Sequence, residues 1–251
     1  MNRSTSRIAL LLATATLLAA LPASSKVLME KKGERIQPTT QEDWFRHPTD
    51  DKYYSESWTA ILRSDQGHII YLNFLYTNIG VVSGRAGVNG GVAMPGKETV
   101  HFSIEHETDD YSEEAESGLI EIATNQFSLK DGQFKIKLDE PDIRLVVTGK
   151  AWMPGVKLHD GKVWLKEDKS YWMSNYFHVP RGSFEAEMVM GKERAKFKGE
   201  IYIDHLVQNK LSPDFSDRWW TTRMFAPDHM ISCLAVRMKK DFGGEMLYRT
   251  L

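Results

Sequence analysis

The sequence has one cysteine in 251 residues, no Gly/Pro-rich tract and a net charge of only −2. The lone cysteine, Cys233, excludes an intramolecular disulfide, so the core and the strand ladders must hold the fold together. The balance of 32 basic and 34 acidic residues argues against an electrostatic nucleic-acid binder. The mean hydropathy of −0.41 excludes a polytopic membrane protein. Aromatic residues are abundant (11%, with seven Trp), which suits β-structure or a ligand cavity.

The first 25 residues are typical of a secretory signal peptide. A basic start is followed by an apolar stretch over 8–20, and small residues including Ser25 precede the expected cut. The apolar stretch is too short to cross a bilayer, which takes roughly 20 helical residues. We therefore expect a periplasmic or secreted protein cleaved near Ser25. Residues 26–56 are expected to form an extended lead-in with one helical turn at 40–45.

From Trp58 onward the apolar residues recur mostly with a period of two, which predicts strands joined by hairpins. In the hairpin that turns at Asp131, Phe127 faces Ile136, so the apolar faces agree. The Gly-rich stretch 84–91 lacks the Lys-Ser/Thr ending of a phosphate loop and is expected to be a plain loop. The strands are expected at 58–63, 68–76, 99–106, 127–138 (with its turn) and 143–150.

The most informative hairpin runs from His178 to His205 and turns at 191–192. A two-residue loop pairs Phe184 with Gly199 and His178 with His205, because a slip of one residue would oppose apolar and charged side chains. Gly199 then lies opposite an aromatic ring, as at bends of barrel walls. About ten short strands with few helices predict an all-β fold, either a closed antiparallel barrel or a strongly curved sheet.

The pattern gives little support for a metal site. His101 and His106 are five residues apart on an expected strand and so point to opposite faces. No His-Glu-x-x-His or Cys-x-x-Cys spacing occurs. His178 and His205 form a pair, but two ligands without a third are weak evidence for zinc. We expect no metal and no cofactor.

The candidate site residues gather at the end of this hairpin and just beyond it. His205 ends an apolar face and is expected inside one barrel mouth, whereas Asp204 points the other way unless a bulge breaks the alternation. Trp219 or Trp220 should contact His205, and with Arg223 they offer stacking or cation–π contacts, or simply plug the barrel end. At least one imidazole of the histidine pair should be neutral at pH 7. The ligand-binding candidates are His205, His178, Trp219, Trp220, Arg223 and Trp58, and the catalytic candidates are His205 and Asp204.

These motifs resemble those of the tandem-lipocalin superfamily. Pro180-Arg181 after His178, the pattern Gly-x-x-x-x-Asp-His at 199–205 and a Trp-rich return strand are similar to carotenoid 1,2-hydratases and the bacterial AttH-like proteins. Segments 76–80 and 206–213, with the Trp pair at 219–220, resemble the fungal survival-factor branch. That branch is linked to oxidative-stress survival and to carrying ceramide-type lipids.

The resemblance covers 57–251 and departs from the family in two places. The hydratase motif continues Asp-His-x-Trp-Gly, but Leu-Val-Gln follows the Asp-His pair here. The family has two lipocalin-like domains, whereas this chain ends soon after the first. The resemblance therefore implies a lipocalin-like β domain over 57–205, with 206–251 as Trp-rich return strands that start an incomplete second β unit.

Two functions from different classes follow from these observations. The first, which we favour, is an exported carrier that holds a hydrophobic, lipid-like molecule in a barrel cavity, linked by the resemblance to oxidative stress. The second is a hydratase or cyclase that protonates a carbon–carbon double bond of an isoprenoid-like substrate, with His205 or Asp204 as general acid. A partner-binding module would instead show a filled barrel and an exposed apolar patch. The expected partner is a hydrophobic small molecule or lipid, not nucleic acid, and peripheral membrane contact stays open.

Overall fold

The computed structural model describes residues 36–79, 82–166, 168–226 and 230–250, so the expected signal peptide lies outside the described residues. The strands are β1 Ile36–Pro38, β2 Ser55–Ser64, β3 Ile69–Ile79, β4 Val82–Ala93, β5 Val100–Glu107, β6 Tyr111–Glu114, β7 Leu119–Ile122, β8 Asn125–Lys130, β9 Gln133–Glu140, β10 Ile143–Ala151, β11 Val156–Trp164, β12 Trp172–Met190, β13 Glu193–Gln208, β14 Ser216–Phe225, β15 Met230–Met238 and β16 Met246–Thr250. The short helix α2 (Ser212–Phe215) and the 3₁₀ turns η1 (Glu42–Trp44), η2 (Thr108–Asp110) and η3 (Lys240–Phe242) complete the elements. No helix within the described ranges is both long and apolar enough to cross a membrane.

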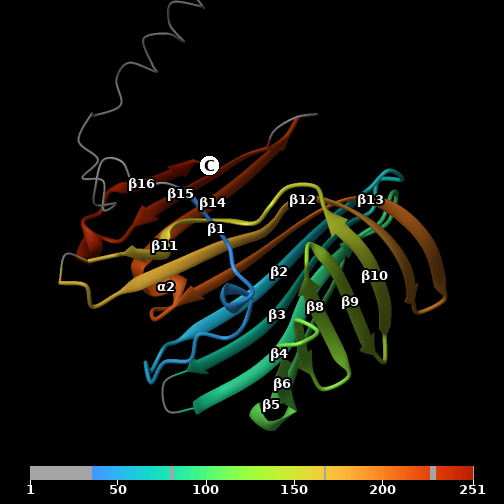
Figure 1. Cartoon of the computed structure of the whole chain (residues 1–251), viewed down its shortest axis with the longest axis horizontal. Helices are drawn as coiled ribbons and strands as arrows, with labels where there is room; N and C mark the ends of the chain where they lie inside the picture. The colour runs from blue at the N-terminus through green and yellow to red at the C-terminus, as the bar shows by residue number, and fades with distance from the viewer. Residues whose placement is uncertain (1–35, 80–81, 167, 227–229, 251) are drawn as a thin grey trace, which may run out of the picture.

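One large antiparallel sheet forms most of the molecule (Figure 1). Its strand order is β5-β4-β3-β2-β13-β12-β10-β9-β8-β7-β6, with β11 and β1 attached beside β12. The two halves of the sheet curl toward each other. Phe74 on β3 contacts Phe127 on β8, with 5.4 Å between the ring centroids. His106 on β5 also lies 3.2 Å from Glu140 at the end of β9. The sheet is a nearly closed barrel, which confirms the expected all-β class.

A ladder of alternating Phe and Gly crosses four neighbouring strands of the barrel. Phe134 on β9 pairs with Gly149 on β10, which pairs with Phe184 on β12, which pairs with Gly199 on β13. A Cβ atom on Gly199 would lie 2.1 Å from the carbonyl oxygen of Arg63, so only glycine fits there. The predicted pairing of Phe184 with Gly199 is confirmed.

The predicted pairing of His178 with His205 is wrong. His205 pairs with Tyr176 instead, because the register shifts twice between Tyr176 and Gly182. The shifts surround Pro180, which has no amide hydrogen to give to a ladder. Val179, between the two shifts, pairs with Ile203 and belongs to the barrel core, so each shift adds one residue without turning the strand over. His178 and His205 both lie on the inner face, where each contacts the carbonyl oxygen of Asp43, although they are no longer directly opposite.

The Gly-rich stretch 84–91 belongs to strand β4, so the expectation of a loop there is wrong. The glycines serve close packing between β3 and β5. A Cβ atom on Gly90 would lie 2.3 Å from the carbonyl oxygen of Tyr71 and 2.7 Å from the ring of Phe102. Alternation could not reveal this strand, because glycine has no side chain to mark a face.

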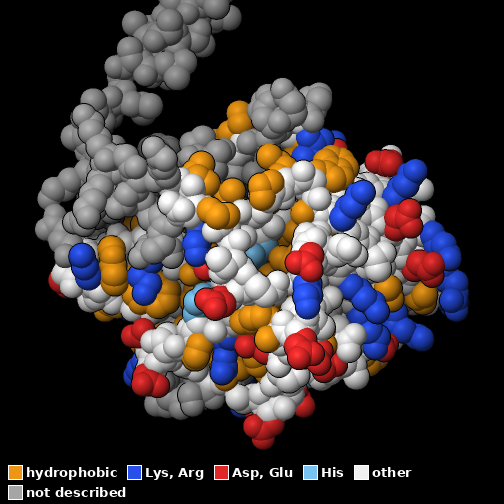
Figure 2. All heavy atoms as spheres, in the orientation of Figure 1, with side chains coloured by type: hydrophobic (Ala, Val, Ile, Leu, Met, Phe, Trp, Pro, Cys, Tyr) orange, Lys and Arg blue, Asp and Glu red, His pale blue; other side chains and the backbone are white. Residues whose placement is uncertain are grey.

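Strands β14, β15 and β16 form a separate three-stranded sheet (Figure 1). It packs with β11 and β12 through a second core of Val163, Leu165, Met173, Phe215, Val236 and Met238. This C-terminal sheet occupies the region in which the sequence predicts the start of a second β unit. Figure 2 shows basic and acidic side chains intermixed over the visible face of the molecule.

Candidate functional site

Strand β13 divides the predicted site residues between two regions. Its pairing with β2 is regular from Gly199 to Gln208, so no bulge interrupts the alternation. His205 therefore points into the barrel, where it is fully buried, and Asp204 points to the outer face. The structure separates the two catalytic candidates, and each belongs to a different set of neighbours.

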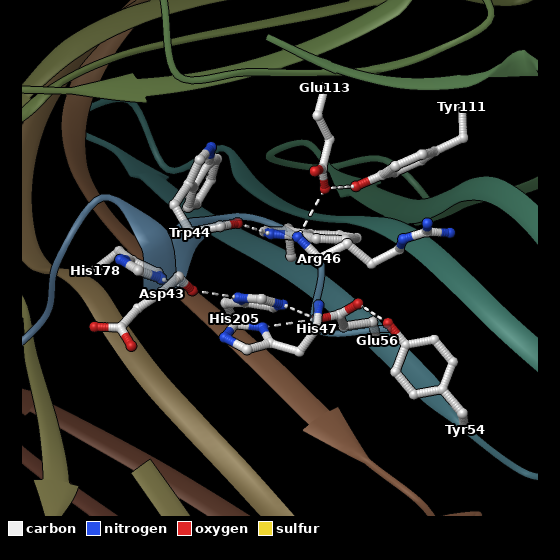
Figure 3. A network of polar contacts seen from close by, with 11 residues as sticks. Asp43, Trp44, Arg46, His47, Tyr54, Glu56, Tyr111, Glu113, His178 and His205 are labelled. Carbon is white, nitrogen blue, oxygen red and sulfur yellow. Dashed lines mark hydrogen bonds and ion pairs between the residues drawn. The ribbon is translucent and has the colours of Figure 1, made fainter. Parts of the chain in front are cut away.

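The inner region is a buried polar network, shown in Figure 3, which we call the interior cluster: His47, Tyr54, Glu56, His178 and His205. The ring of His205 is bonded at both nitrogens. Nδ1 lies 2.9 Å from the carbonyl oxygen of Asp43, and Nε2 lies 3.0 Å from Oε1 of Glu56. A carbonyl oxygen can only accept, so Nδ1 of His205 carries a hydrogen.

Glu56 is the fully buried acceptor of the interior cluster. Its Oε1 accepts the backbone N–H of His47 at 2.8 Å, and Nδ1 of His47 lies 3.1 Å away. Its Oε2 accepts the hydroxyl of Tyr54. Burial alone would raise the pKa of Glu56, but the bonds from His205 and His47 outweigh it and lower the pKa to about 2. Glu56 is therefore a carboxylate, and burial with the charge of Glu56 raises the pKa of Tyr54, which stays protonated.

The turn η1 positions the histidines. The side chain of Asp43 binds Nζ of Lys157, with 2.7 Å to each oxygen, and accepts the backbone N–H of Thr40 at 2.7 Å. These contacts hold Asp43 in place. Its backbone carbonyl oxygen lies 3.2 Å from Nε2 of His178 and 2.9 Å from Nδ1 of His205. Burial, followed by the charge of His205, lowers the pKa of His178 to about 3. His178 is therefore neutral at pH 7, as expected for one imidazole of the pair.

The tryptophan beside His205 is Trp58, not Trp219 or Trp220. Trp58 stacks on His205 at 4.6 Å between ring centroids, and its Nε1–H donates to the carbonyl of Trp44 at 2.7 Å. Trp219 packs near Phe215 behind the barrel wall, and the side chain of Trp220 is exposed. The expectation that Trp219 or Trp220 contacts His205 is wrong because β14 lies in the C-terminal sheet, against the outer face of β13.

The outer region is a cavity of about 440 Å³ between the barrel wall and the C-terminal sheet, which we call the intersheet cavity. Three predicted residues, Asp204, Trp219 and Arg223, border it together. Its volume falls in the range of small-molecule sites. The lining residues are Ser57, Thr59, Ile61, Tyr71, Asn175, Phe177, Asp204, Leu206, Ser212, Trp219, Thr221, Arg223, Ser232 and Leu234.

An ion pair lies at the wall of the intersheet cavity. Oδ2 of Asp204 accepts the Tyr202 hydroxyl at 2.6 Å and an Arg223 N–H at 3.0 Å. The Arg223 guanidinium stacks 3.8 Å above the Tyr202 ring. Burial and the charge of Asp204 raise the pKa of Tyr202, so its hydroxyl stays protonated. Among the described residues, Nε of Arg223 and Oδ1 of Asn175 are buried atoms without a hydrogen-bond partner.

Comparison with known proteins places this fold. Neither a protein family nor a curated protein matches the sequence. The structure is similar to CghA (TM-score 0.60, 9% identity, 90% of this chain and 64% of that one). It is also similar to an AttH from Nitrosomonas europaea (TM-score 0.58, 11% identity, 85% of this chain and 73% of that one). A third similar structure is kievitone hydratase from Nectria haematococca (TM-score 0.52, 8% identity, 78% of this chain and 60% of that one). The fold is lipocalin-like. At these identities the similarity establishes the fold alone.

Within this lipocalin-like barrel, the sequence analysis missed several polar residues of the two regions, among them His47, Tyr54, Glu56, Asn175 and Tyr202. One signal was available for Glu56. It is two residues before Trp58, so alternation continued back from the expected strand at 58–63 places both on the inner face. His47 has no such signal, because it lies in the irregular lead-in before β2. Nothing in the sequence relates it to His205.

Proposed function

We propose that the protein is an enzyme of the hydratase or cyclase type that binds an unsaturated, largely apolar molecule in the intersheet cavity. The observation that carries this proposal is the buried, unpartnered Nε–H of Arg223 at the border of that cavity. An unpaired buried donor costs about 1–3 kcal/mol, which an acceptor on a bound molecule would recover. Phe177, Leu206 and Trp219 supply apolar surface for the rest of the molecule.

The ion pair suggests how such a reaction would proceed. A carbonyl oxygen conjugated to the double bond would accept from Arg223, whose charge would draw electrons from the double bond. Asp204, which is ion-paired with Arg223, would take a proton from water or from an acidic carbon. In hydration the π bond breaks, the water oxygen bonds one carbon and the proton returns to the other. In cyclisation the deprotonated carbon bonds one carbon of the double bond, the π bond breaks and the proton returns to the other carbon, so no atom is lost.

These roles differ from those expected from the sequence. Asp204 would act as a base rather than as a general acid, since its partner is a guanidinium. His205 would take no part, because it lies on the other face of β13. The comparisons add support, since one neighbour is named a hydratase and CghA was crystallised with the small molecule Sch210972.

A lipid carrier that uses the barrel interior has less support. Trp44, Trp58, Phe74 and Phe127 are fully buried there, and the ring centroids of Trp44 and Phe127 are 4.9 Å apart. A carrier could use the intersheet cavity instead, and it would bind without converting its ligand. Export with cleavage near Ser25, membrane contact, a link to oxidative stress and the likeness to the survival-factor branch remain predictions from the sequence.

The test is turnover of conjugated enones such as chalcones by the purified protein. Loss of the enone absorbance would be followed by mass spectrometry, which shows a gain of one water for hydration and an unchanged mass for cyclisation. Arg223→Met and Asp204→Asn should each lower kcat/KM by about 100-fold or more, as loss of a charge-stabilising group does. Trp220→Ala, at an exposed site on the same strand, is the matched control and should keep full activity.

Two outcomes would count against the enzyme. Equal turnover by the parent, Arg223→Met and Asp204→Asn proteins would remove the ion pair from the reaction. Binding of enones without conversion, weakened by Arg223→Met, would favour the carrier in the same cavity.

A further inference from the structure

The interior cluster has a surplus of donors on one atom. Oε1 of Glu56 is approached by the backbone N–H of His47 at 2.8 Å, by Nδ1 of His47 at 3.1 Å and by Nε2 of His205 at 3.0 Å. A carboxylate oxygen has about two lone-pair sites, so three hydrogen-bond donors exceed its capacity. A single cation bound by both ring nitrogens and Oε1 would leave the backbone N–H as the only donor.

From this geometry we infer that His47, Glu56 and His205 form a binding site for a divalent transition metal ion, with zinc as the ion to test. Their ligand atoms, Nδ1, Oε1 and Nε2, all lie within 4.8 Å of one another. In tetrahedral zinc sites, ligand atoms about 2.0 Å from the ion are about 3.3 Å apart. The two N···O separations, 3.0 and 3.1 Å, need to widen only slightly.

The surroundings of the three ligands match those of metal sites. A metal-bound histidine characteristically donates its other ring N–H to a carbonyl or carboxylate. His205 does so through Nδ1–H to the carbonyl of Asp43, which leaves the lone pair on Nε2 for an ion. The remaining oxygen of Glu56 accepts the Tyr54 hydroxyl, so the carboxylate offers one oxygen to the ion.

Stacked aromatic rings hold both imidazoles in orientation. Trp58 stacks on His205 at 4.6 Å with 15° between the planes, and Tyr176 stacks on His47 at 5.2 Å with 9°. Preorganised ligands bind a metal without first giving up rotamer freedom. The side chain of His47 is 32% exposed, so an ion can enter from this side and a water molecule can take the fourth position.

The charges also suit a divalent ion. Glu56 is a fully buried acidic side chain, and such a group needs a compensating partner. The alternative is an ion pair in which Nε2 of His205 carries a proton. An experiment can separate the two, because a metal replaces that proton and is released by a chelator. This inference does not depend on the proposed function, since the interior cluster and the intersheet cavity lie on opposite faces of β13.

The experiment measures metal content and affinity in the whole protein. We expect one equivalent of zinc by mass spectrometric elemental analysis after purification without chelators, and a rise in Tm when zinc returns to chelator-treated protein. His47→Ala should weaken zinc binding by about 100-fold or more. His178→Gln is the matched control, because His178 is buried in the same cluster and supplies no ligand; it should bind zinc as the parent does.

His205→Gln is a second test of the site. His205 is fully buried, so this variant can fail to fold. His47 is only half-buried, so His47→Ala still tests the site in that case. Stoichiometric zinc binding that is lost in His47→Ala and kept in His178→Gln would support the site. Two results would overturn it: a folded parent protein that takes up no zinc, with NMR showing a doubly protonated His205, or equal zinc affinity in the parent and His47→Ala.

Discussion

Asp204 and His205 are neighbours on one strand, but the polar groups near His205 crowd one acceptor, whereas some near Asp204 have no partner. Around His205, donors outnumber the acceptor sites on a single oxygen of Glu56. Around Asp204, an arginine N–H and an amide oxygen are buried without partners beside open space. A surplus of donors is relieved by a cation, whereas an unmatched donor is relieved by a ligand oxygen. The comparison shows that two polar clusters, each built around one buried acidic side chain, can suit different occupants.

The strongest test of this comparison removes the acceptor of the interior cluster. Glu56→Leu leaves two imidazoles and the Tyr54 hydroxyl facing an apolar side chain, and it should lower the free energy of unfolding by about 3–5 kcal/mol. Urea unfolding followed by Trp fluorescence would measure it. A loss below about 1 kcal/mol would show that Glu56 is not the centre of the cluster.

The second test compares two tryptophans, one from each region. Trp58→Phe removes the bond from Nε1 to the carbonyl of buried Trp44 and should cost about 1–3 kcal/mol. Trp219→Phe should cost less, because Trp219 borders a cavity and its indole N–H has no bond among the described residues. Parallel urea titrations would rank them. The reverse order would mean that the C-terminal sheet contributes more to stability than the interior.

The third test weakens the ion pair of the intersheet cavity. Asp204→Asn keeps the shape of the side chain and one acceptor oxygen, and Arg223 remains 17% exposed. We expect a loss of about 1–3 kcal/mol, because both side chains are mostly buried and the guanidinium loses its compensating charge, although Asn still offers one acceptor oxygen. Thermal unfolding at low and high salt would check it, and a cost comparable to that of Glu56→Leu would abolish the distinction between the regions.

The smallest effect concerns pH. Burial raises the pKa of Asp43, but bonds from Lys157 and Thr40 outweigh it and leave the pKa below its ordinary 3.8. The folded carboxyl therefore binds a proton less tightly than the unfolded one, so its contribution is complete above that ordinary value and is lost as the pH falls through the lowered pKa. The difference in Tm between the parent and Asp43→Asn should shrink between about pH 5 and pH 3. A constant difference would contradict this.

Much of the barrel could be predicted from alternation alone. The pairing of Phe127 with Ile136, the pairing of Phe184 with Gly199 and the opposite directions of Asp204 and His205 all follow from a period of two. Strand β4 could not be predicted in this way, because its glycines carry no pattern.

The candidate site was harder to predict for two physical reasons. Local alternation assigns a face to a residue but not a partner from another strand, so Glu56 and His47 were not connected with His205. The register shift near Pro180 is set by tertiary packing, so Tyr176 rather than His178 became the strand partner of His205. The assignment of Trp219 and Arg223 to the outer face depends on where the C-terminal sheet docks, which no local pattern encodes.

The paired irregularities in β12 give this strand spare length. Between the pairs Tyr176–His205 and Gly182–Ile201, β12 advances by six residues while β13 advances by four. A deletion of one residue in this segment would remove one irregularity and keep both pairs, because a bulge holds an extra residue without turning the flanking side chains to the other face. Natural variation in the length of β12 should therefore be tolerated here one residue at a time.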